Sequence, residues 1–535
     1  MRRESDSNQP DSTSSTPSSG RRGINWRVLR LLGVVLLVAF LGWQMNERQQ
    51  QRNSMDFAKR VRPDRLRIGS LTFTSCAIGS ARTVVMKAYC TEFSVPENHA
   101  APDGRRIRLK VAVVKSAAAQ ANADIVTFLD GGPGGAATED FPALAAAFEP
   151  LLKRHHVLLV DQRGTGGSHQ LDCPTLRNQR MEQLTLDLES ANEPRFDQAL
   201  RECLTEITQQ SDPAYYATRD AVADLEQLRQ ALGAPQLNLV GVSYGTRVAQ
   251  QYAGQYPQAV RSMVLDSVVP NALVLGQDHA RNLETALQTQ FARCVANTEC
   301  QQRFGDPYVT LHKLRKRLTN PVNVELLHPY SNEPSQRQLT QERLITLVRL
   351  YAYNPASSAL LPLVLDEAWQ GRYAPLLAQE QMLTTSVSEQ LTAGMSLSVS
   401  CTEDADLLQT DAADSDTLLG NSLIDYMHKA CALWPHHSMP ASFHDALTSD
   451  IPTLLLAGEN DPVTPPHYAQ EVTQTLSHAR ILTAPEQGHA VLAVRCMPEL
   501  VGQFVENLAP ETLNADCLQL LHAPPAFLNY NGAAP

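Results

Sequence analysis

Apolar and polar residues along the chain follow patterns that predict alternating strands and helices. Residues 106–116 (RIRLKVAVVKS) alternate with a period of two, which is typical of a strand with one buried face. The apolar runs in ADIVTFLDGGPGG and HHVLLVDQRGTGGS end in glycine-rich loops, and RSMVLDSVVP reads as a further strand. Residues 220–234 have the helical period and close at Gly233. Strands alternating with helices predict a mostly parallel sheet flanked by helices.

The pattern changes after Pro270. Residues 271–445 read mostly as helices, interrupted by turns such as NPVNVELLHPYSNEPS, with few strand signals. The stretches IPTLLLAGENDPVTPP and ARILTAPEQGHAVLAV then return to units of strand, loop and helix. We therefore expect one α/β core, formed by residues 66–270 and 446–535, with a mainly helical cap inserted at 271–445.

The N-terminal part differs from the rest in composition. Residues 1–23 are polar and Ser-rich, which is typical of a disordered segment. Arginines precede the apolar run LLGVVLLVAFLGWQM, and residues 24–45 can span a bilayer if the flanking arginines reach its surface. No small-residue cleavage site follows, so we expect a signal anchor, a linker at 46–65 and an exported domain on the periplasmic or extracytoplasmic side. A buried core helix is the alternative.

Cysteine usage favours export. The chain has ten cysteines, all after the apolar run, and none forms a CxxC pair, which gives zinc or thioredoxin-like chemistry little support. They fall as neighbours along the chain, so local disulfides, for example between Cys294 and Cys300, are expected in an oxidising compartment. Ten unrelated buried thiols in a cytosolic protein are the alternative, and they fit the expected anchor less well.

Size and charge limit the classes of protein that the chain can represent. Its 535 residues suit one large domain with an insertion, or two domains. The formal net charge is -11. A nucleic-acid-binding protein needs a basic surface to displace phosphate counterions, so no nucleic-acid partner is expected.

The segment Gly241-Val242-Ser243-Tyr244-Gly245 is the first candidate for chemistry. An apolar strand precedes it, a helical pattern follows it, and its glycines permit the sharp turn that exposes a nucleophilic serine. A serine hydroxyl is a weak nucleophile at neutral pH, so it needs a base, and the base needs an orienting acid. Ser243 is therefore the candidate nucleophile. A serine that merely lies between two glycines is the alternative.

The candidate acid and base follow in the order that this strand-turn-helix context requires. Asp461 lies in a loop just after one strand, and His489 lies in the loop after the next strand. Both positions are at carboxyl ends of predicted parallel strands, which would bring them beside Ser243. Asp266, at the end of the strand after the nucleophile helix, is the alternative acid. Its other reading is a structural hydrogen-bond acceptor.

Acyl transfer also needs donors that stabilise an oxyanion. One donor should be the amide of Tyr244, the residue after the nucleophile. The second should come from the loop LDGGPGG, where Gly132 or Gly131 can present a bare amide at close range. A simple turn is the alternative reading of that loop.

These motifs together resemble the prolyl and tripeptidyl aminopeptidase-like serine peptidases of the α/β-hydrolase fold, most of all the tripeptidyl branch. The matching stretches are GGPGG at 131–135, DQRGTGGS at 161–168, NLVGVSYGTRVA at 238–249, LAGENDPVTPP at 456–466 and GHAV at 488–491. They span most of the chain outside the N-terminal tail and the insertion. The resemblance implies that Ser243 is the nucleophile, Asp461 the acid and His489 the base. It also implies that Tyr244 and Gly132 supply the two oxyanion donors. It implies no metal and no organic cofactor.

The resemblance also gives the cap a function. In the family, acidic residues of the helical insertion bind the free α-ammonium of a peptide, and a buried carboxylate suits that task because an unpaired ammonium in a closed cleft is costly. The segment SVSCTEDAD at 398–406 resembles that region, with Glu403 the first candidate and Asp404 the second. A solvated acidic turn beside a disulfide is the alternative. The chain departs from prolyl aminopeptidases at Asp130, where they often have His.

The sequence therefore predicts an exported, membrane-anchored serine aminopeptidase whose substrates are peptides with free N-termini. An exported carboxylesterase or lipase is the alternative within the same enzyme class, because fold does not fix function. Dehalogenase or epoxide-hydrolase chemistry is disfavoured, since an Asp would be expected where Ser243 stands. A catalytically silent binding protein of the same fold is disfavoured because every required residue type is present.

Overall fold

The computed structural model describes residues 64–80, 84–118, 124–172 and 194–533. The tail predicted at 1–23, the signal anchor predicted at 24–45 and all but the last two linker positions lie outside these residues. Within the described ranges, no helix is long and apolar enough to cross a membrane. A strand begins at Arg65, one residue before the predicted start of the core.

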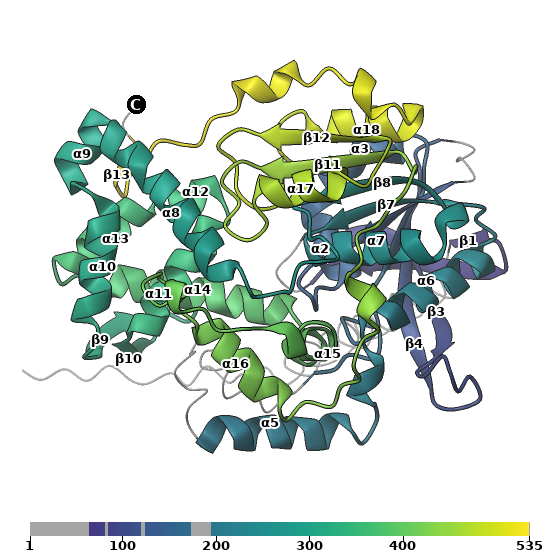
Figure 1. Cartoon of the computed structure of the whole chain (residues 1–535), viewed down its shortest axis with the longest axis horizontal. Helices are drawn as coiled ribbons and strands as arrows, with labels where there is room; N and C mark the ends of the chain where they lie inside the picture. Colours follow the sequence, from purple (N-terminus) through teal and green to yellow (C-terminus); the bar gives the residue numbers. More distant parts are fainter. Residues whose placement is uncertain (1–63, 81–83, 119–123, 173–193, 534–535) are drawn as a thin grey trace, which may run out of the picture. The chain divides into compact units, whose positions relative to one another are not determined.

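A ten-stranded sheet forms the core of the α/β part of the described fold (Figure 1). Its spatial order is β1-β2-β3-β4-β6-β5-β7-β8-β11-β12. From β6 onward in this order the strands are parallel, whereas β1 to β4 form an antiparallel meander that joins β6. The strands are β1 Arg65–Ile68, β2 Leu71–Ile78, β3 Met86–Pro96, β4 Arg106–Val114, β5 Ile125–Leu129, β6 Val157–Val160, β7 Leu237–Val242, β8 Val260–Asp266, β11 Thr453–Gly458 and β12 Ala479–Ala484. The predicted mostly parallel sheet is confirmed.

The register of the parallel strands brings their carboxyl ends to one edge of the sheet. Val242 at the end of β7 pairs with Asp266 at the end of β8. Gly458 at the end of β11 pairs with Ala484 at the end of β12. The loops that follow these strands therefore emerge beside one another, at the edge where open α/β sheets usually bind their ligands.

Helices cover both faces of the sheet, which explains why the central strands read as continuous apolar runs. Leu239 and Leu265 point into a hydrophobic core on one face, whereas Val240 and Val264 point into a core on the other. The first face is covered by α6 (Thr218–Leu232), α7 (Tyr244–Gln255) and α17 (Pro466–Thr473). The second face is covered by α2 (Ala137–Leu144), α3 (Glu149–Leu152) and α18 (Met497–Asn507).

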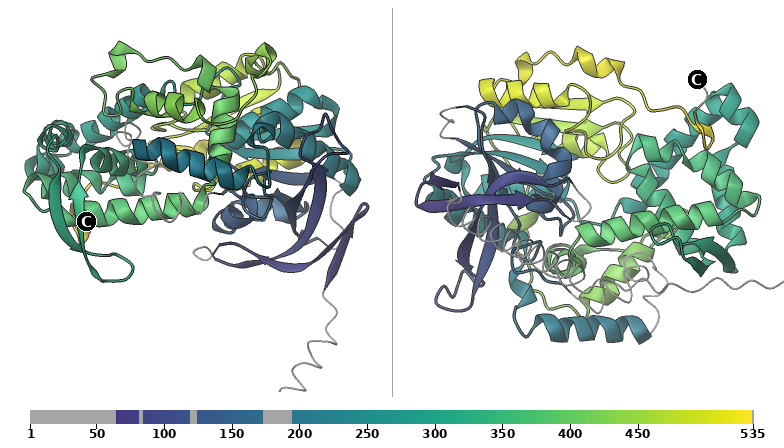
Figure 2. Two further views of the ribbon diagram at one scale, coloured as in Figure 1. Left: turned by 90° about the horizontal axis from the view of Figure 1, so that it is seen from below. Right: turned by 180° about the vertical axis from the view of Figure 1, so that it is seen from behind.

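The predicted helical insertion is present as a second group of helices beside the sheet (Figure 2). Leu344, Leu347 and Leu365 belong to its own hydrophobic core. The helices are α8 His279–Ala296, α9 Thr298–Phe304, α10 Pro307–Arg317, α11 Gln341–Ala352, α12 Pro355–Ser358, α13 Leu361–Trp369 and α14 Ala374–Gln390. The C-terminal hairpin, β13 (Phe527–Asn529) with β14 (Gly532–Ala533), returns to this cap, where Phe527 N donates to Ala359 O at 2.9 Å.

The stretch NPVNVELLHPYSNEPS, expected to contain only turns, contains most of a β-hairpin. β9 (Val322–Leu327) pairs antiparallel with β10 (Pro334–Leu339). Val324 and Leu326 are buried, and the residues next to them are exposed. This alternation is the period of two that marks a strand, and it is short enough to be overlooked between long helical patterns.

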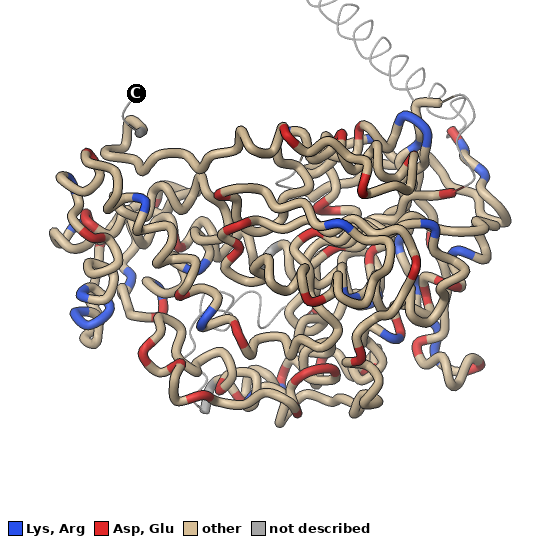
Figure 3. The backbone as a smooth tube through the Cα atoms, turned by 45° about the horizontal axis from the view of Figure 1, so that its top comes forward, with Lys and Arg blue, Asp and Glu red and all other residues tan. Residues whose placement is uncertain are grey.

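Basic and acidic residues are distributed over both the core and the cap (Figure 3). Some of them form ion pairs that are closed off from solvent. Arg163 pairs with Asp224 at 2.6 Å, and Arg247 pairs with Asp404 at 2.8 Å. Residues relevant to a site therefore have to be identified from their contacts and not from the net charge.

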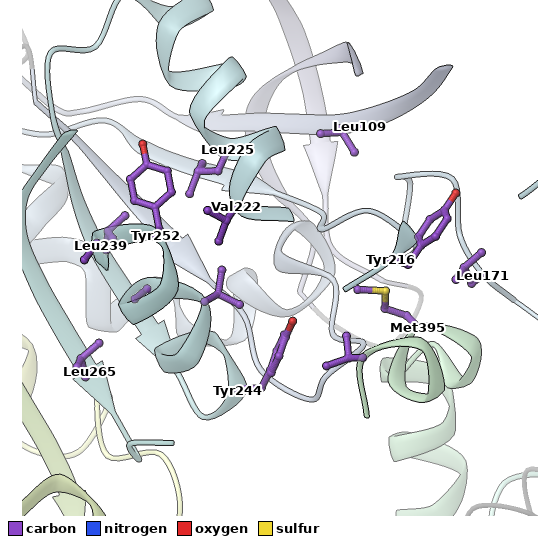
Figure 4. Packing of buried hydrophobic residues seen from close by; sticks show 14 of the residues in the cluster. Leu109, Leu171, Tyr216, Val222, Leu225, Leu239, Tyr244, Tyr252, Leu265 and Met395 are labelled. Carbon is purple, nitrogen blue, oxygen red and sulfur yellow. The ribbon is translucent and has the colours of Figure 1, made fainter. Parts of the chain in front are cut away.

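The last helices of the predicted cap segment pack against the core of the sheet. α15 (Ala393–Glu403) and α16 (Ser422–Cys431) contribute to the same cluster as α5 (Pro194–Ile207). Figure 4 shows Met395 of α15 close to Leu171 and Tyr216 of the core. A helical period reveals that a helix has an apolar face, but not which core that face joins.

Four disulfide bonds join described residues, and all connect cysteines that are close in sequence. They are Cys76–Cys90, Cys294–Cys300, Cys401–Cys431 and Cys496–Cys517. The expected local pairing, including the bond between Cys294 and Cys300, is confirmed. Disulfides of this kind are typical of proteins that fold outside the cytoplasm.

Candidate active site

Ser243 lies on a tight turn between the buried strand β7 and helix α7. Its backbone has φ 54° and ψ -124°, a conformation that costs a non-glycine residue free energy and is often found at functional turns. Its amide donates to Asp266 O at 2.9 Å, and its carbonyl accepts from Thr246 N at 2.9 Å. The residue is partly exposed. The turn therefore presents the serine at the edge of the sheet, in the arrangement that the motif predicts.

Close packing explains the glycines around this turn. A Cβ on Gly245 would lie 2.1 Å from Leu129 O, and a Cβ on Gly241 would lie 2.5 Å from Gly245 O. The loop after β5 passes against the serine, because a Cβ on Gly131 would lie 3.1 Å from Ser243 Cβ. Only residues without a side chain allow the strand, the turn and the loop to approach this closely.

Asp461 and His489 lie in the loops after β11 and β12 and form a hydrogen-bonded pair. His489 Nδ1 is 2.8 Å from Asp461 Oδ2. The carboxylate also accepts from the amides of Val463 and Thr464 and from Thr464 Oγ1, each at 2.8 Å. Burial alone would raise the pKa of Asp461, but His489 and these hydrogen bonds outweigh burial and lower it to about 2. Burial acts to lower the pKa of His489, and the Asp461 carboxylate outweighs it and raises that pKa.

Asp266, the alternative acid, holds the loop after His489 and not its ring. Its carboxylate accepts from Val491 N at 3.0 Å and from Leu492 N at 2.8 Å, and the residue is fully buried. Its backbone carbonyl accepts the amide of Ser243. Asp266 therefore has the structural role that the sequence left open, and it connects the serine turn to the histidine loop.

Ser243 and His489 lie on these connected loops. Within the described part of the chain, no hydrogen bond joins Ser243 Oγ to the ring of His489. The side chain of His489 is 11% exposed, and that of Asp461 has no exposed area. Hydrogen bonds of this kind often become short only when a substrate binds, so the arrangement is compatible with a serine, histidine and aspartate that act together.

The cap contributes a residue, Tyr353, that the sequence motifs do not reveal. Tyr353 is the residue after α11, and its carbonyl accepts from His489 N at 2.8 Å. Its ring lies edge-on to the imidazole, with 5.2 Å between the ring centroids. A Cβ on Gly488 would lie 2.1 Å from Tyr353 O. The glycine before His489 thus allows the cap to contact the histidine loop. In the sequence, the only signal of this contact is the glycine that precedes the histidine.

Two backbone amides are candidates for binding an oxyanion beside Ser243. Tyr244 is the first residue of α7, and amides in the first turn of a helix have no acceptor within the helix. In the facing loop, Gly131 N donates to Asp130 Oδ1 at 2.8 Å. The Gly131 amide is therefore engaged, which favours Gly132 as the second donor. Gly132 has φ 116°, a value that favours glycine.

Three carboxyl groups lie close to this loop. Asp161 accepts from Thr138 N at 2.8 Å, from Thr138 Oγ1 at 3.0 Å and from Gly167 N at 2.9 Å. Asp130 and Asp140 interact with each other. Burial raises the pKa of Asp130, and burial together with the charge of Asp130 raises the pKa of Asp140. In the described ranges, no group of three His, Cys, Asp or Glu residues is arranged to hold a metal ion.

Glu403 and Asp404, expected to bind a substrate N-terminus, are closed off from solvent at the end of α15. Their side chains have no exposed area and face Arg247, whose Nη1 is 2.8 Å from Asp404 Oδ2 and 3.6 Å from Glu403 Oε2. Glu403 Oε1 accepts from Thr218 N at 2.6 Å. Burial raises the pKa of Glu403 to about 7, although Arg247 acts to lower it. In this conformation the segment is neither an open binding surface nor the solvated turn considered as the alternative.

Residues 124–495 match the family described as alpha/beta hydrolase fold. The chain belongs to this family. The matched region includes the strand ends that carry Ser243, Asp461 and His489, and the protein is a serine hydrolase of the α/β-hydrolase fold. The fold class predicted from the sequence is thereby confirmed.

Known peptidases are among the relatives of this chain. It is 25% identical over 464 residues to the serine protease Hip1 of Mycobacterium tuberculosis, covering 80% of this chain and 87% of the relative. It is 30% identical over 200 residues to the tripeptidyl aminopeptidase of Streptomyces lividans, covering 34% and 35% of the two chains. The crystal structure of a proline iminopeptidase from Mycobacterium smegmatis has a TM-score of 0.37 and 16% identity, and covers 79% and 100%. The sequence relatives confirm the resemblance to this group of peptidases.

Proposed function

We propose that this protein is an exported serine aminopeptidase that hydrolyses peptide bonds near the free N-termini of peptides. Ser243 is the nucleophile, His489 the general base and Asp461 the orienting acid. The observation that carries the proposal is a strained serine turn and a buried Asp461–His489 hydrogen bond, both at the carboxyl ends of parallel strands of one sheet. Its relatives among serine proteases and aminopeptidases support peptides as the substrate class.

The proposed reaction follows the usual course of acyl transfer. Ser243 Oγ attacks the scissile carbonyl carbon while His489 Nε2 takes its proton, and the negative charge that forms on the carbonyl oxygen is bound by the amides of Tyr244 and Gly132. The bond to the leaving amine breaks as His489 returns the proton to that amine. Water, activated by His489, then hydrolyses the acyl-enzyme. Asp461 remains ionised throughout because its pKa is about 2, and it stabilises the imidazolium.

Glu403, with Asp404, is the proposed binding site for the substrate N-terminus. Two carboxylates face one guanidinium, that of Arg247, so the cluster has a net negative charge when both are ionised. Among the described residues, Glu403 Oε2 and Asp404 Oδ1 have no hydrogen-bond partner. An ammonium group would supply the missing donors. Because the carboxylates are closed off in this structure, this role requires α15 or the residues packed against it to move when substrate binds.

The proposed location is the outer side of a membrane, with residues 24–45 as the anchor. The four disulfide bonds support a non-cytoplasmic location. The apolar sequence after the N-terminal arginines supports the anchor.

Matched substrates test the proposed activity. The full-length protein, solubilised in mild detergent, is incubated with peptides that differ only in a free or acetylated N-terminus, and separately with p-nitrophenyl acetate. Products are identified by mass spectrometry, and Ser243→Ala serves as the inactive control. We expect cleavage of the free-N-terminus peptides alone, and its loss in Ser243→Ala. Ester hydrolysis with every peptide intact would replace the peptidase by a carboxylesterase.

A further inference from the structure

One face of helix α11 in the cap meets the candidate base. Leu344 and Leu347 point into the hydrophobic core of the cap. Arg349 and Tyr353 lie outside that core, are partly buried and, four positions apart, share another face of the helix. Tyr353 contacts His489 through both its carbonyl and its ring. The face that carries Arg349 is therefore directed toward the histidine loop.

Helix α8 begins beside the same group. Asn282 Nδ2, in its first turns, donates to Val463 O at 3.1 Å and fastens α8 to the loop that carries the candidate acid. His279 is the first residue of α8. Burial, and after it the charge of Arg349, lowers the pKa of His279 to about 3, and Asp461 and the candidate base act on the same imidazole. The charges of Arg349, Asp461 and the candidate base thus act on one imidazole, although these residues belong to different elements.

Among the described residues Arg349 has no acidic partner, unlike the arginine that precedes it on the same helix and one on another helix of the cap. Arg343, on the same helix, pairs with Glu380 at 2.8 Å, and Arg303 pairs with Asp366 at 2.8 Å. In the described part of the chain, no carboxylate forms an ion pair with Arg349. A partly buried guanidinium without an anion loses part of its hydration and gains nothing in return. A carboxylate fits its planar set of donors best.

The position of Arg349 determines which part of a substrate it meets. In acyl transfer the base returns its proton to the leaving amine, so the leaving group lies beside His489. We propose that Arg349 binds a carboxylate on the leaving group, so that the preferred substrates are short peptides in which the C-terminal carboxylate closely follows the scissile bond. This proposal rests on the peptidase function proposed above, and it makes the cap responsible for selecting the leaving group.

Pairs of peptides test the proposal on the full-length, disulfide-bonded protein. Each peptide is an alanine oligomer with a free N-terminus, in a series from dipeptide to pentapeptide, and ends in either a carboxylate or a carboxamide. The two members of a pair differ only in the charge that Arg349 would bind. The ratio of their kcat/KM values is measured for the wild type, Arg349→Gln and Arg349→Lys. Arg343→Gln is the matched control, because it removes an arginine of the same helix that is already paired.

The wild type is expected to prefer the carboxylate about ten- to a hundredfold in kcat/KM for the shortest peptide that it cleaves, the range of a hydrogen bond to a charged group. The ratio should fall as the leaving group lengthens, disappear in Arg349→Gln and survive in part in Arg349→Lys. It should be unchanged in Arg343→Gln. Equal rates for both members of every pair in the wild type, or a preference that persists in Arg349→Gln, would overturn the proposal.

A pair of esters separates this proposal from the peptidase function. The meta isomer of acetoxybenzoate carries a carboxylate on its leaving phenol, and its methyl ester does not. If all peptides stay intact but the wild type, unlike Arg349→Gln, hydrolyses the acid faster than the methyl ester, the peptidase function fails and the role of Arg349 stands. If peptides are cleaved with no difference between carboxylate and carboxamide, the peptidase function stands and the role of Arg349 fails.

Discussion

The core and the cap both contribute residues to the candidate active site, but they hold them in different ways. In the core, Ser243 and His489 lie on loops that Asp266 holds, through its carbonyl, which accepts from Ser243 N, and through its carboxylate, which accepts from the amides after His489. In the cap, Arg349 projects from a helix whose position depends on a separate hydrophobic core. The core therefore fixes the reacting groups in a narrow geometry, whereas the side chains on the cap can change without altering that geometry. This division suits chemistry in the core and selection in the cap.

Two buried carboxyl groups show the same contrast in their electrostatics. Asp461 of the core accepts three hydrogen bonds from its own loop and one from His489, and its pKa is lowered to about 2. Glu403 at the end of α15 shares Arg247 with Asp404, and burial raises its pKa to about 7. The surrounding charges and donors, and not the depth of burial, separate the two groups: His489 and the loop donors lower the pKa of Asp461, whereas the charge of Asp404 opposes the effect of Arg247 on Glu403. A permanently ionised carboxylate can orient a base, whereas one that titrates near neutrality can respond to an incoming ammonium.

Replacing the acid should have the largest effect. Asp461→Asn keeps the size of the side chain but removes the charge that stabilises the imidazolium, so kcat is expected to fall about 10,000-fold. Asp266→Asn is the matched comparison in the core: it weakens the acceptor of Val491 N and Leu492 N and should lower kcat much less. Steady-state kinetics with a free-N-terminus peptide measures both. A larger loss of kcat in Asp266→Asn than in Asp461→Asn would mean that Asp266, and not Asp461, is the acid that orients His489.

Adding one methyl group at Gly488 should break the contact between the cap and the loop of the candidate base. Gly488→Ala would place a Cβ 2.1 Å from Tyr353 O, so the histidine loop or the end of α11 must move. We expect a loss of stability of about 1–3 kcal/mol, which is typical of overpacking, together with a lower kcat. Gly254→Ala is the control, because its Cβ would approach only Leu447 Cδ1, at 3.6 Å. Thermal melting and kinetics are compared for both; a wild-type kcat in Gly488→Ala would show that the base does not depend on the cap.

The sequence located the core residues of the candidate site at the strand ends where the structure has them, but it did not reveal the contacts of the cap, for a physical reason. Ser243, Asp461 and His489 each follow a strand with a strong apolar pattern, and parallel strands place such positions at one edge whatever the details of packing. Tyr353 and Arg349 lie near the end of a helix whose contact with His489 depends on how two hydrophobic cores meet. No local pattern encodes that contact. Glu403 was found by motif, but its complete burial against Arg247 depends on α15 joining the core of the sheet.

Removing the charge of Glu403 should affect binding more than turnover. If its carboxylate receives the substrate ammonium, Glu403→Gln should raise KM for free-N-terminus peptides by about tenfold with little change in kcat, because one charge-assisted hydrogen bond is weakened. Asp406→Asn, an exposed carboxylate three positions further along, is the control. An unchanged KM accompanied by a lower melting temperature would leave Glu403 with a structural role only.

The smallest expected effect concerns the carboxyl pair beside the glycine-rich loop. Since the pKa values of Asp130 and Asp140 are raised in the folded protein, the folded state retains a proton that the unfolded chain has released. The pair therefore makes the free energy of unfolding decrease as pH rises from the unfolded pKa near 4 toward the raised folded values, by at most about 1.4 kcal/mol per pH unit for one proton.

Asp140→Asn tests this dependence by removing the repulsion within the pair. The variant's free energy of unfolding should fall less than that of the wild type between about pH 5 and pH 8, and its oxyanion loop should remain in place because Asp130 Oδ1 still accepts from Gly131 N. Urea unfolding at a series of pH values measures the slope, with the exposed Glu149→Gln as the control. A slope equal to that of the wild type would mean that the proton is held elsewhere. A loss of activity in the same variant would mean that the carboxyl pair also holds the oxyanion loop in place. The loop after β5 would then belong, like the serine turn, to the part of the core whose geometry is fixed.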